Sequence, residues 1–198
     1  NAGINGFVRN DSLSYPFSGV IKGATKGEDG KYKITVNNLT RQYYGGLFPQ
    51  LGDGVSFENI NIGGYLGYQI TQTTATGAAG VLAANSIGGM TLKGVDVSVV
   101  LRGHCVASVW DNATMYCYGG YVGNVDIGTG KIIVDGCNIS PYISNMNCHY
   151  FVGGLFGKVL LKNATLASSI EVRNSNVSTQ IIADKNMGYG NPTSGAHI

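Results

Sequence analysis

Apolar and polar positions follow two short patterns that recur along the chain and predict strands. In the first pattern, a small residue is followed by glycine and then by two apolar residues. Its copies are Ser18-Gly19-Val20-Ile21, Gly45-Gly46-Leu47-Phe48, Ala79-Gly80-Val81-Leu82, Gly119-Gly120-Tyr121-Val122 and Gly153-Gly154-Leu155-Phe156. Glycine occupies the second position of every copy. This indicates that backbones approach closely there or that φ is positive. We therefore expect each copy to mark the start of a strand.

The second pattern has six columns and follows the last four copies of the first. Its good copies start at Phe57, Leu92, Val134 and Val172, and an imperfect copy spans residues 34–39. In the good copies, column one is apolar and column six is Ile or Val, so both should point inward. Column three holds only Asn or Gly, which tolerate a left-handed backbone best, and it predicts a corner between two short strands. Column five holds Asn or Asp, which suits a ladder of stacked side chains.

Column two carries a charge in each good copy, and its sign alternates along the chain. The residues are Glu58, Lys93, Asp135 and Arg173. Opposite charges that face each other on neighbouring strands attract, whereas like charges repel. The alternation therefore predicts that the copies stack in sequence order.

Together the two patterns predict an all-β fold, a parallel β-helix-like solenoid with about five irregular repeats and atypical end caps. The last four copies of the first pattern start 34, 40 and 34 residues apart, so each repeat has room for several short strands and a loop. The alternative is an antiparallel sandwich or barrel, which also uses regular short strands. We assign residues 1–17 to an N-terminal cap or assembly segment, 18–182 to the repeat-built domain and 183–198 to a C-terminal cap or tail.

Composition narrows the range of partners. The chain has 31 glycines, only 12% charged residues and a net charge of +2. Nucleic-acid binders need a dense basic stripe, so we expect no nucleic-acid partner. No apolar run reaches the length of about 18 residues that marks a membrane-spanning helix, so we expect no membrane span.

The four cysteines point to an oxidising, extracellular compartment. Cys105, Cys117, Cys137 and Cys148 allow three connectivities, and we favour the pairing of sequence neighbours, Cys105 with Cys117 and Cys137 with Cys148. Each bridge would close a short loop and contribute about 3 kcal/mol in the chain-entropy account. The alternative is four buried thiols. The chain has no Cys-x2-Cys motif, so we expect no metal site.

Asn-x-Ser/Thr sequons point to the same compartment. They exceed the roughly two or three that this composition gives by chance, although three of them fall inside the six-column pattern. The acceptor residues are Asn10, Asn38, Asn112, Asn138, Asn163 and Asn176. In a eukaryotic or archaeal source these residues are candidates for N-glycosylation, whereas in an ordinary bacterium they mean little.

Residues 152–157 (Val-Gly-Gly-Leu-Phe-Gly), with residues 169–177 downstream, resemble the GLUG-type repeats of bacterial surface adhesins and of the stalks of secreted peptidases. Residues 63–67 and 119–123 match in part, and Gly46-Leu47-Phe48 departs from the motif at Pro49. The resemblance extends over about residues 18–180. It implies an extracellular β-solenoid with an adhesive or spacer role, and it carries no catalytic residues.

Candidate catalytic groups are few. The three histidines are His104, His149 and His197, and no Gly-x-Ser-x-Gly nucleophile motif is present. The enzyme alternative is a polysaccharide lyase or hydrolase built on a β-helix, which needs paired carboxylates. The column-two acids are separated by a lysine, so they fit a charge ladder better than a catalytic pair. A loop such as Glu28-Asp29-Gly30 is a candidate for Ca²⁺, but adjacent carboxylates in a glycine-rich turn are expected to be solvated, so no cofactor is predicted.

The aromatic residues are the remaining functional signal. Trp110, Tyr116, Tyr118 and Tyr121 lie close together in the chain, with the Trp110 region between copies of the patterns, and they suggest a ligand or subunit interface. We therefore expect a non-catalytic extracellular surface module. Its partner would be either a surface glycan or protein, or further copies of itself assembled end to end into a filament or coat.

Overall fold

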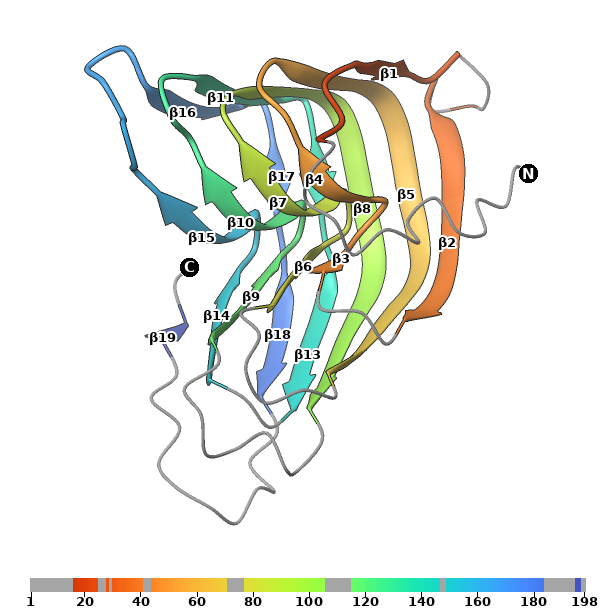
Figure 1. Cartoon of the computed structure of the whole chain (residues 1–198). Helices are drawn as coiled ribbons and strands as arrows, with labels where there is room; N and C mark the ends of the chain where they lie inside the picture. Colours follow the sequence, from red (N-terminus) through yellow and green to blue (C-terminus); the bar gives the residue numbers. More distant parts are fainter. Residues whose placement is uncertain are drawn as a thin grey trace.

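The computed structural model describes residues 16–24, 28, 30–40, 44–70, 77–105, 115–146, 149–183 and 195–196. These residues form strands and turns with no helix, and every strand pairing among them is parallel (Figure 1). The chain is a β-solenoid, as the sequence patterns predict, and the antiparallel alternative is wrong. No described helix is long and apolar enough to cross a membrane.

Three parallel sheets line the solenoid, and the chain visits them in a fixed order. The five-stranded sheet consists of β3 (Tyr44–Gly45), β6 (Gly77–Gly80), β9 (Met115–Gly119), β14 (His149–Gly153) and β19 (Gly195–Ala196). The four-stranded sheet consists of β4 (Phe48–Leu51), β7 (Ala83–Ile87), β10 (Val122–Asp126) and β15 (Phe156–Leu160). The chain runs from the five-stranded sheet through the four-stranded sheet into the third sheet and then repeats this order. Each turn therefore adds one strand to the edge of each of the first two sheets.

The third sheet, called the long sheet below, has ten strands. They are β1 (Val20–Lys22), β2 (Tyr32–Thr40), β5 (Val55–Ile70), β8 (Met90–Cys105), β11 (Lys131–Asp135), β12 (Asn138–Ile139), β13 (Tyr142–Met146), β16 (Ser169–Arg173), β17 (Asn176–Val177) and β18 (Gln180–Ala183). One passage along this sheet, from column one onward, is called a rung. Figure 1 shows the long strands β2, β5, β8, β13 and β18 side by side.

The six-column register is confirmed. Phe57 pairs with Leu92, Leu92 with Val134 and Val134 with Val172, so column one runs through all four good copies. Column three turns through the same left-handed conformation in all four good copies. The φ angles are 55° at Asn59, 61° at Gly94, 64° at Gly136 and 51° at Asn174. Asn and Gly stand there because the corner needs a positive φ that other residues resist.

The imperfect copy at residues 34–39 is wrong in register. Ile34 pairs with Ile62 and therefore occupies column six, not column one. Column one of that rung is Ile21, which pairs with Phe57, and column two is Lys22, which pairs with Glu58. The rung contains an insertion at the corner between residues 23 and 32, and this insertion shifted the sequence alignment.

The glycine motif forms the bend between the five-stranded and four-stranded sheets. Strands β4, β10 and β15 begin at the last residue of their motif copy, and β7 begins directly after it. An added Cβ at Gly80 would lie 2.6 Å from the Cα of Val122, and one at Gly46 would lie 2.6 Å from the Cα of Ala83. Close backbone approach is therefore the reason for these glycines. The copy at residues 18–21 is an exception, because Val20 pairs with Ser56 and the segment enters the long sheet instead.

The core fills the space between the three sheets. Columns one and six are buried in the middle rungs, with no member from Phe57 to Ile139 more than 1% exposed. Full burial of each such side chain stabilises the fold by about 1.5–3 kcal/mol. At the N-terminal end Phe17 stacks on Phe48, with ring centroids 4.5 Å apart. The core is continuous along the solenoid, and each rung depends on its neighbours for burial.

Candidate functional site

The outward face of the long sheet carries like side chains in rows, because each column repeats at the strand spacing of about 4.8 Å. Column two is a charge ladder whose sign alternates over five rungs, since Lys22 extends it at the N-terminal end. Lys22 Nζ lies 3.1 Å from Glu58 Oε2, and Arg173 Nε lies 3.2 Å from Asp135 Oδ2. The prediction that opposite charges stack on adjacent rungs is confirmed.

Asp135 is held in its charged form by its neighbours on the next rung. The Asn174 side-chain amide donates a hydrogen bond of 3.0 Å to Asp135 Oδ1. That hydrogen bond and the adjacent Arg173 guanidinium keep the pKa of Asp135 below its usual value. This carboxylate is therefore an acceptor and a counter-ion at neutral pH, not a proton donor.

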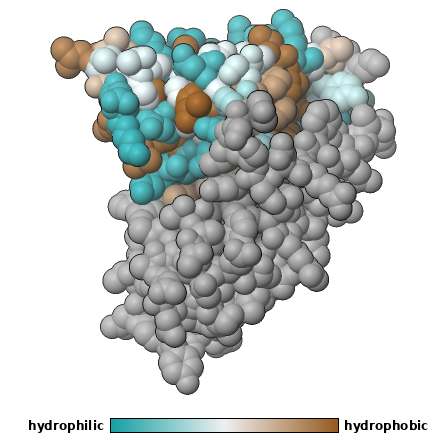
Figure 2. Space-filling model, viewed as in Figure 1, coloured by the Kyte–Doolittle hydropathy of each residue, from teal (hydrophilic) through white to brown (hydrophobic). Residues whose placement is uncertain are grey.

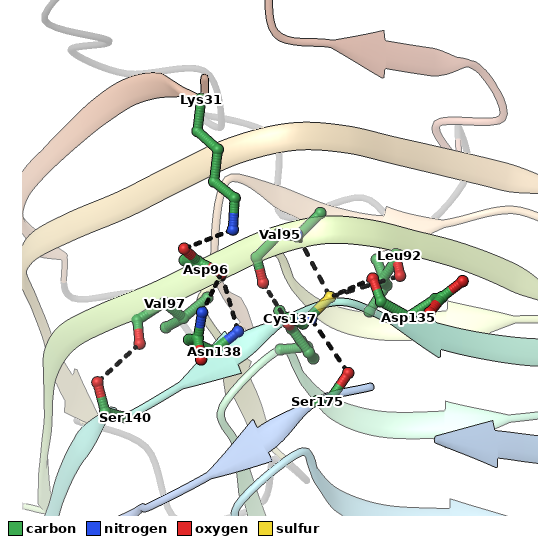
Figure 3. A network of polar contacts seen from close by, with 11 residues as sticks. Lys31, Leu92, Val95, Asp96, Val97, Asp135, Cys137, Asn138, Ser140 and Ser175 are labelled. Atoms are coloured by element: carbon green, nitrogen blue, oxygen red, sulfur yellow. Dashed lines mark hydrogen bonds and ion pairs between the residues drawn. The ribbon is translucent and has the colours of Figure 1, made fainter. Parts of the chain in front are cut away.

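Column five is the polar ladder that the sequence predicts, with Asp96 as its centre (Figure 3). Lys31 Nζ lies 2.7 Å from Asp96 Oδ2, and the backbone N–H of Asn138 donates to Asp96 Oδ1 at 2.8 Å. The side-chain amide of Asn138 donates to the same oxygen at 3.4 Å. Lys31 and Asp96 are each less than one-fifth exposed, so this ion pair is well shielded from water. The pair explains why one acid stands in a column of asparagines.

Other described carboxylates are also engaged within the chain. Asp53 Oδ1 accepts a hydrogen bond of 2.6 Å from the backbone N–H of Gly89, and Asp126 Oδ1 accepts one of 3.3 Å from Gly128. Among the described residues, no group of three or more His, Cys, Asp or Glu side chains could hold a metal ion. The candidate Ca²⁺ loop is described only in part, since Asp29 lies outside the described residues. Asp53 and Asp126 thus hold turns at the end of the four-stranded sheet.

A row of hydroxyls and a row with two tyrosines run beside the polar ladder. Ser98, Ser140 and Ser178 are exposed on successive rungs. Two positions further along, Tyr65 and Tyr142 both pair with Val100 from opposite sides. The two tyrosine side chains are half-buried, and Val100 between them is 37% exposed. The two tyrosines are therefore two strand spacings, or about 9–10 Å, apart along the sheet.

The predicted aromatic interface is wrong for two of its four members. Tyr118 and Tyr121 are 1% and 0% exposed and belong to the core. The Tyr121 hydroxyl donates to the carbonyl oxygen of Val95, and burial, with the nearby Cys137 thiol, raises its pKa. The sequence already indicates that Tyr121 is buried, because it occupies the motif position that holds Val81 or Leu155 in other copies. Trp110 and the side chain of Tyr116 lie outside the described residues.

The two predicted disulfides are also wrong, because Cys117 and Cys137 are free buried thiols. Cys105 ends β8 in the long sheet, whereas Cys117 lies in β9 of the five-stranded sheet, so sequence proximity does not bring that pair onto one sheet. Cys148 and the side chain of Cys105 lie outside the described residues. Burial raises the pKa of the Cys117 thiol to about 11. The alternative of buried thiols holds for these two cysteines.

Cys137 occupies column four and ties three rungs together (Figure 3). The backbone N–H of Val95 donates to its Sγ at 3.3 Å, and Sγ lies 3.5 Å from the carbonyl oxygen of Leu92. Its own backbone N–H donates to Ser175 Oγ at 3.1 Å. This thiol is only 1% exposed, so it is a structural part of the corner and not an accessible nucleophile.

Three of the six sequon asparagines have described side chains, and all three are exposed: Asn138, Asn163 and Asn176. Asn163 stands in the turn region 161–168, at a φ of 56°. Asn138 and Asn176 stand on the long sheet in column five. Asn10, Asn112 and the side chain of Asn38 lie outside the described residues. Of these three acceptors, Asn163 is the one that lies in a turn and not in a strand.

No family model matches the chain, and neither a curated protein nor a solved structure is detectably similar to it.

Proposed function

We propose that this chain is a non-catalytic, extracellular adhesive module that binds a neutral glycan along the outward face of its long sheet. The observation that carries the proposal is the pair Tyr65 and Tyr142, which flank Val100 beside rows of hydroxyls and amides. Tyrosine rings offer flat apolar faces for sugar rings, and the adjacent rows offer hydrogen bonds to sugar hydroxyls. The two residues are two strand spacings apart, about 9–10 Å, which is comparable with the length of a disaccharide.

Two further observations support a binding role over the polysaccharide-cleaving alternative. Glu58 and Asp135 are both paired with cations, and Lys93 stands between them. Asp96 is saturated by Lys31 and Asn138. Cleavage needs a pair of carboxylates free to exchange protons or attack at a common point. The resemblance to GLUG-type repeats of surface adhesins points to the same adhesive role.

The extracellular location rests on the sequons, since the two predicted disulfides fail. The exposed turn that contains Asn163 supports it. Chain purified from its native source should lose mass on enzymatic deglycosylation, with the modified peptide containing Asn163. An unchanged mass would remove the argument from the sequons, without bearing on the glycan-binding face.

Binding is tested by calorimetric titration with soluble glycans of defined chemistry. Cellohexaose and chitohexaose are the neutral probes, and an oligogalacturonate is the charged comparison. We expect a neutral probe to bind, and Tyr65→Ala or Tyr142→Ala to weaken binding at least tenfold, or about 1.4 kcal/mol. Tyr65→Phe keeps the ring and should retain most of the affinity. Val20→Ala alters an exposed residue of the same sheet outside the tyrosine row and should change nothing.

Binding that survives both alanine substitutions would contradict the assignment of this face. Failure of every neutral probe, with product release from the charged one, would favour the polysaccharide-acting enzyme instead.

A further inference from the structure

Among the described residues, the last rung of the long sheet is unpaired along one edge. Strands β16, β17 and β18 pair with β11, β12 and β13, and no described strand pairs with their other edge. The inward side chains Ile170, Val172 and Val177 are 42%, 46% and 43% exposed. Their counterparts one rung earlier are no more than 1% exposed, because a further rung covers them. The C-terminal end of the described solenoid therefore presents the cross-section of its core.

Exposed apolar residues concentrate at this end. Of the large apolar residues that are exposed in the described chain, most fall between residues 161 and 182: Leu161, Leu166, Ile170, Val172, Val177 and Ile182. Figure 2 shows apolar patches among polar atoms on the visible upper face, including one at the upper left, where Figure 1 shows the turn between β15 and β16. An unpaired strand edge beside apolar side chains is the arrangement that accepts an added strand.

The charged side chains of the last rung indicate which polypeptide strand could pair with it. Arg173 is 56% exposed and continues the alternating ladder, so the residue stacked on its free side should be acidic. Glu171, two residues earlier on the same outward face, is exposed and calls for a basic residue. Between them, Val172 calls for an apolar residue that points inward. The complementary strand therefore reads basic, apolar, acidic, followed by Gly or Asn at the corner above Asn174.

The N-terminal rung of a second copy does not satisfy this pattern. In register, it would place Lys22 on Arg173 and Val20 on Glu171, so that two cations face each other and the acid lacks a partner. Its corner also contains the insertion between residues 23 and 32, whereas Asn174 turns directly. Head-to-tail stacking of identical copies is therefore disfavoured at the position that sets the register.

We propose that the C-terminal end of this chain docks a polypeptide other than its own N-terminal rung, as one more parallel rung. The docked segment carries a basic residue over Glu171, an acid over Arg173 and apolar residues over Ile170, Val172 and Val177. This surface is separate from the glycan-binding face, so either proposal can fail while the other stands.

The probe is a synthetic peptide of residues 131–140, which form the rung that already covers the other side of β16. The peptide carries Ile133→Lys to face Glu171 and Cys137→Ser to prevent oxidation. A matched peptide carries Asp135→Lys in addition. We expect the first peptide to bind the full chain at least tenfold more tightly than the second. We also expect it to slow hydrogen exchange in β16 to β18 and to leave exchange in β1 and β2 unchanged.

The role of the Arg173 charge is tested by a variant that should gain affinity for the second peptide. Arg173→Glu should reverse the preference and favour the lysine peptide, a result that a misfolded variant cannot give. Val172→Asp should abolish binding of both peptides while the melting temperature stays close to that of the unchanged chain, because the side chain is half-exposed.

Equal affinity for the two peptides, absence of binding at millimolar concentration or protection confined to the N-terminal rung would each overturn the proposal. Light scattering of the unchanged chain addresses self-assembly. Particles that grow with protein concentration, and that Val172→Asp dissolves, would show that a second copy is the occupant and would overturn it as well.

Discussion

Replacement of Gly136 by alanine isolates the cost of the left-handed corner. Gly136 has a φ of 64°, and an added Cβ would have no neighbouring atom within 4 Å, so crowding contributes nothing. For a non-glycine residue this left-handed conformation is about 1–2 kcal/mol less favourable than the right-handed one. Alanine also lowers the conformational entropy of the unfolded chain, which stabilises the folded state by about 0.4–1 kcal/mol. Gly136→Ala should therefore lower the free energy of unfolding by about 1 kcal/mol.

Gly136→Asn is the matched variant. Asparagine tolerates the left-handed region, and Asn59 and Asn174 already occupy the same column at φ angles of 55° and 51°. The asparagine variant should therefore stay within about 0.5 kcal/mol of the unchanged chain, because its conformational cost is smaller than that of alanine. Gly94 is a less suitable site, because an added Cβ there would lie 3.1 Å from the Asn59 side chain.

Guanidinium unfolding measures the difference. For m-values of about 2–6 kcal/mol/M, a loss of 1 kcal/mol lowers the midpoint by about 0.2–0.5 M. The slope should not change, because the substitution leaves the buried surface intact. The reasoning is refuted if Gly136→Ala unfolds at the original midpoint, or if alanine and asparagine cost the same.

Three further substitutions or treatments test other parts of the structure. Lys93→Glu would place three acids in a row with Glu58 and Asp135; it should lower the melting temperature by about 1–4 °C at low salt and by less in 1 M NaCl, as calorimetry can measure. Gly80→Ala drives a Cβ into backbone atoms at the bend and should cost at least the roughly 1–3 kcal/mol of an overpacked core, so soluble folded protein with an unchanged midpoint would argue against the close approach. Because the pKa of Cys117 rises from 9.0 to about 11, its thiolate fraction at pH 8 falls about 100-fold; peptide mapping after iodoacetamide treatment should show labelling at least that much slower than in the unfolded chain, and rapid labelling of the folded chain would contradict its burial.

Local signals located the corners and the stacking order, but they misplaced features that depend on insertion or distance. The copy at residues 34–39 satisfied the apolar columns by chance, because the insertion between residues 23 and 32 separates it from column one of that rung, which is Ile21. The pairing of Cys105 with Cys117 assumed that sequence neighbours meet in space. In a solenoid, residues only a dozen apart lie on different sheets, whereas residues about one full turn apart touch. Cys137 accordingly contacts Val95 and Ser175, which are 42 and 38 positions away.

The aromatic residues also show that local patterns do not specify contacts between distant residues. Tyr121 follows the glycine pair at a position that is apolar in the other copies, so its inward direction could be read from the motif. Its burial depends on the hydroxyl reaching the carbonyl oxygen of Val95, a partner 26 residues away that no local pattern specifies. Tyr65 and Tyr142, in contrast, become a pair only because Val100 lies between them in the sheet register.

The sequence alone determined the alternation of inward and outward positions, the left-handed corner and the order in which rungs stack. It could do so because these features repeat in each rung and arise from the conformational limits of Gly and Asn and from the signs of neighbouring charges. Only the tertiary structure decided that Lys31 neutralises Asp96, that Cys117 and Cys137 stay free and that the last rung exposes its core. Those outcomes depend on distances between rungs and on what covers each end, and neither is encoded in any single repeat.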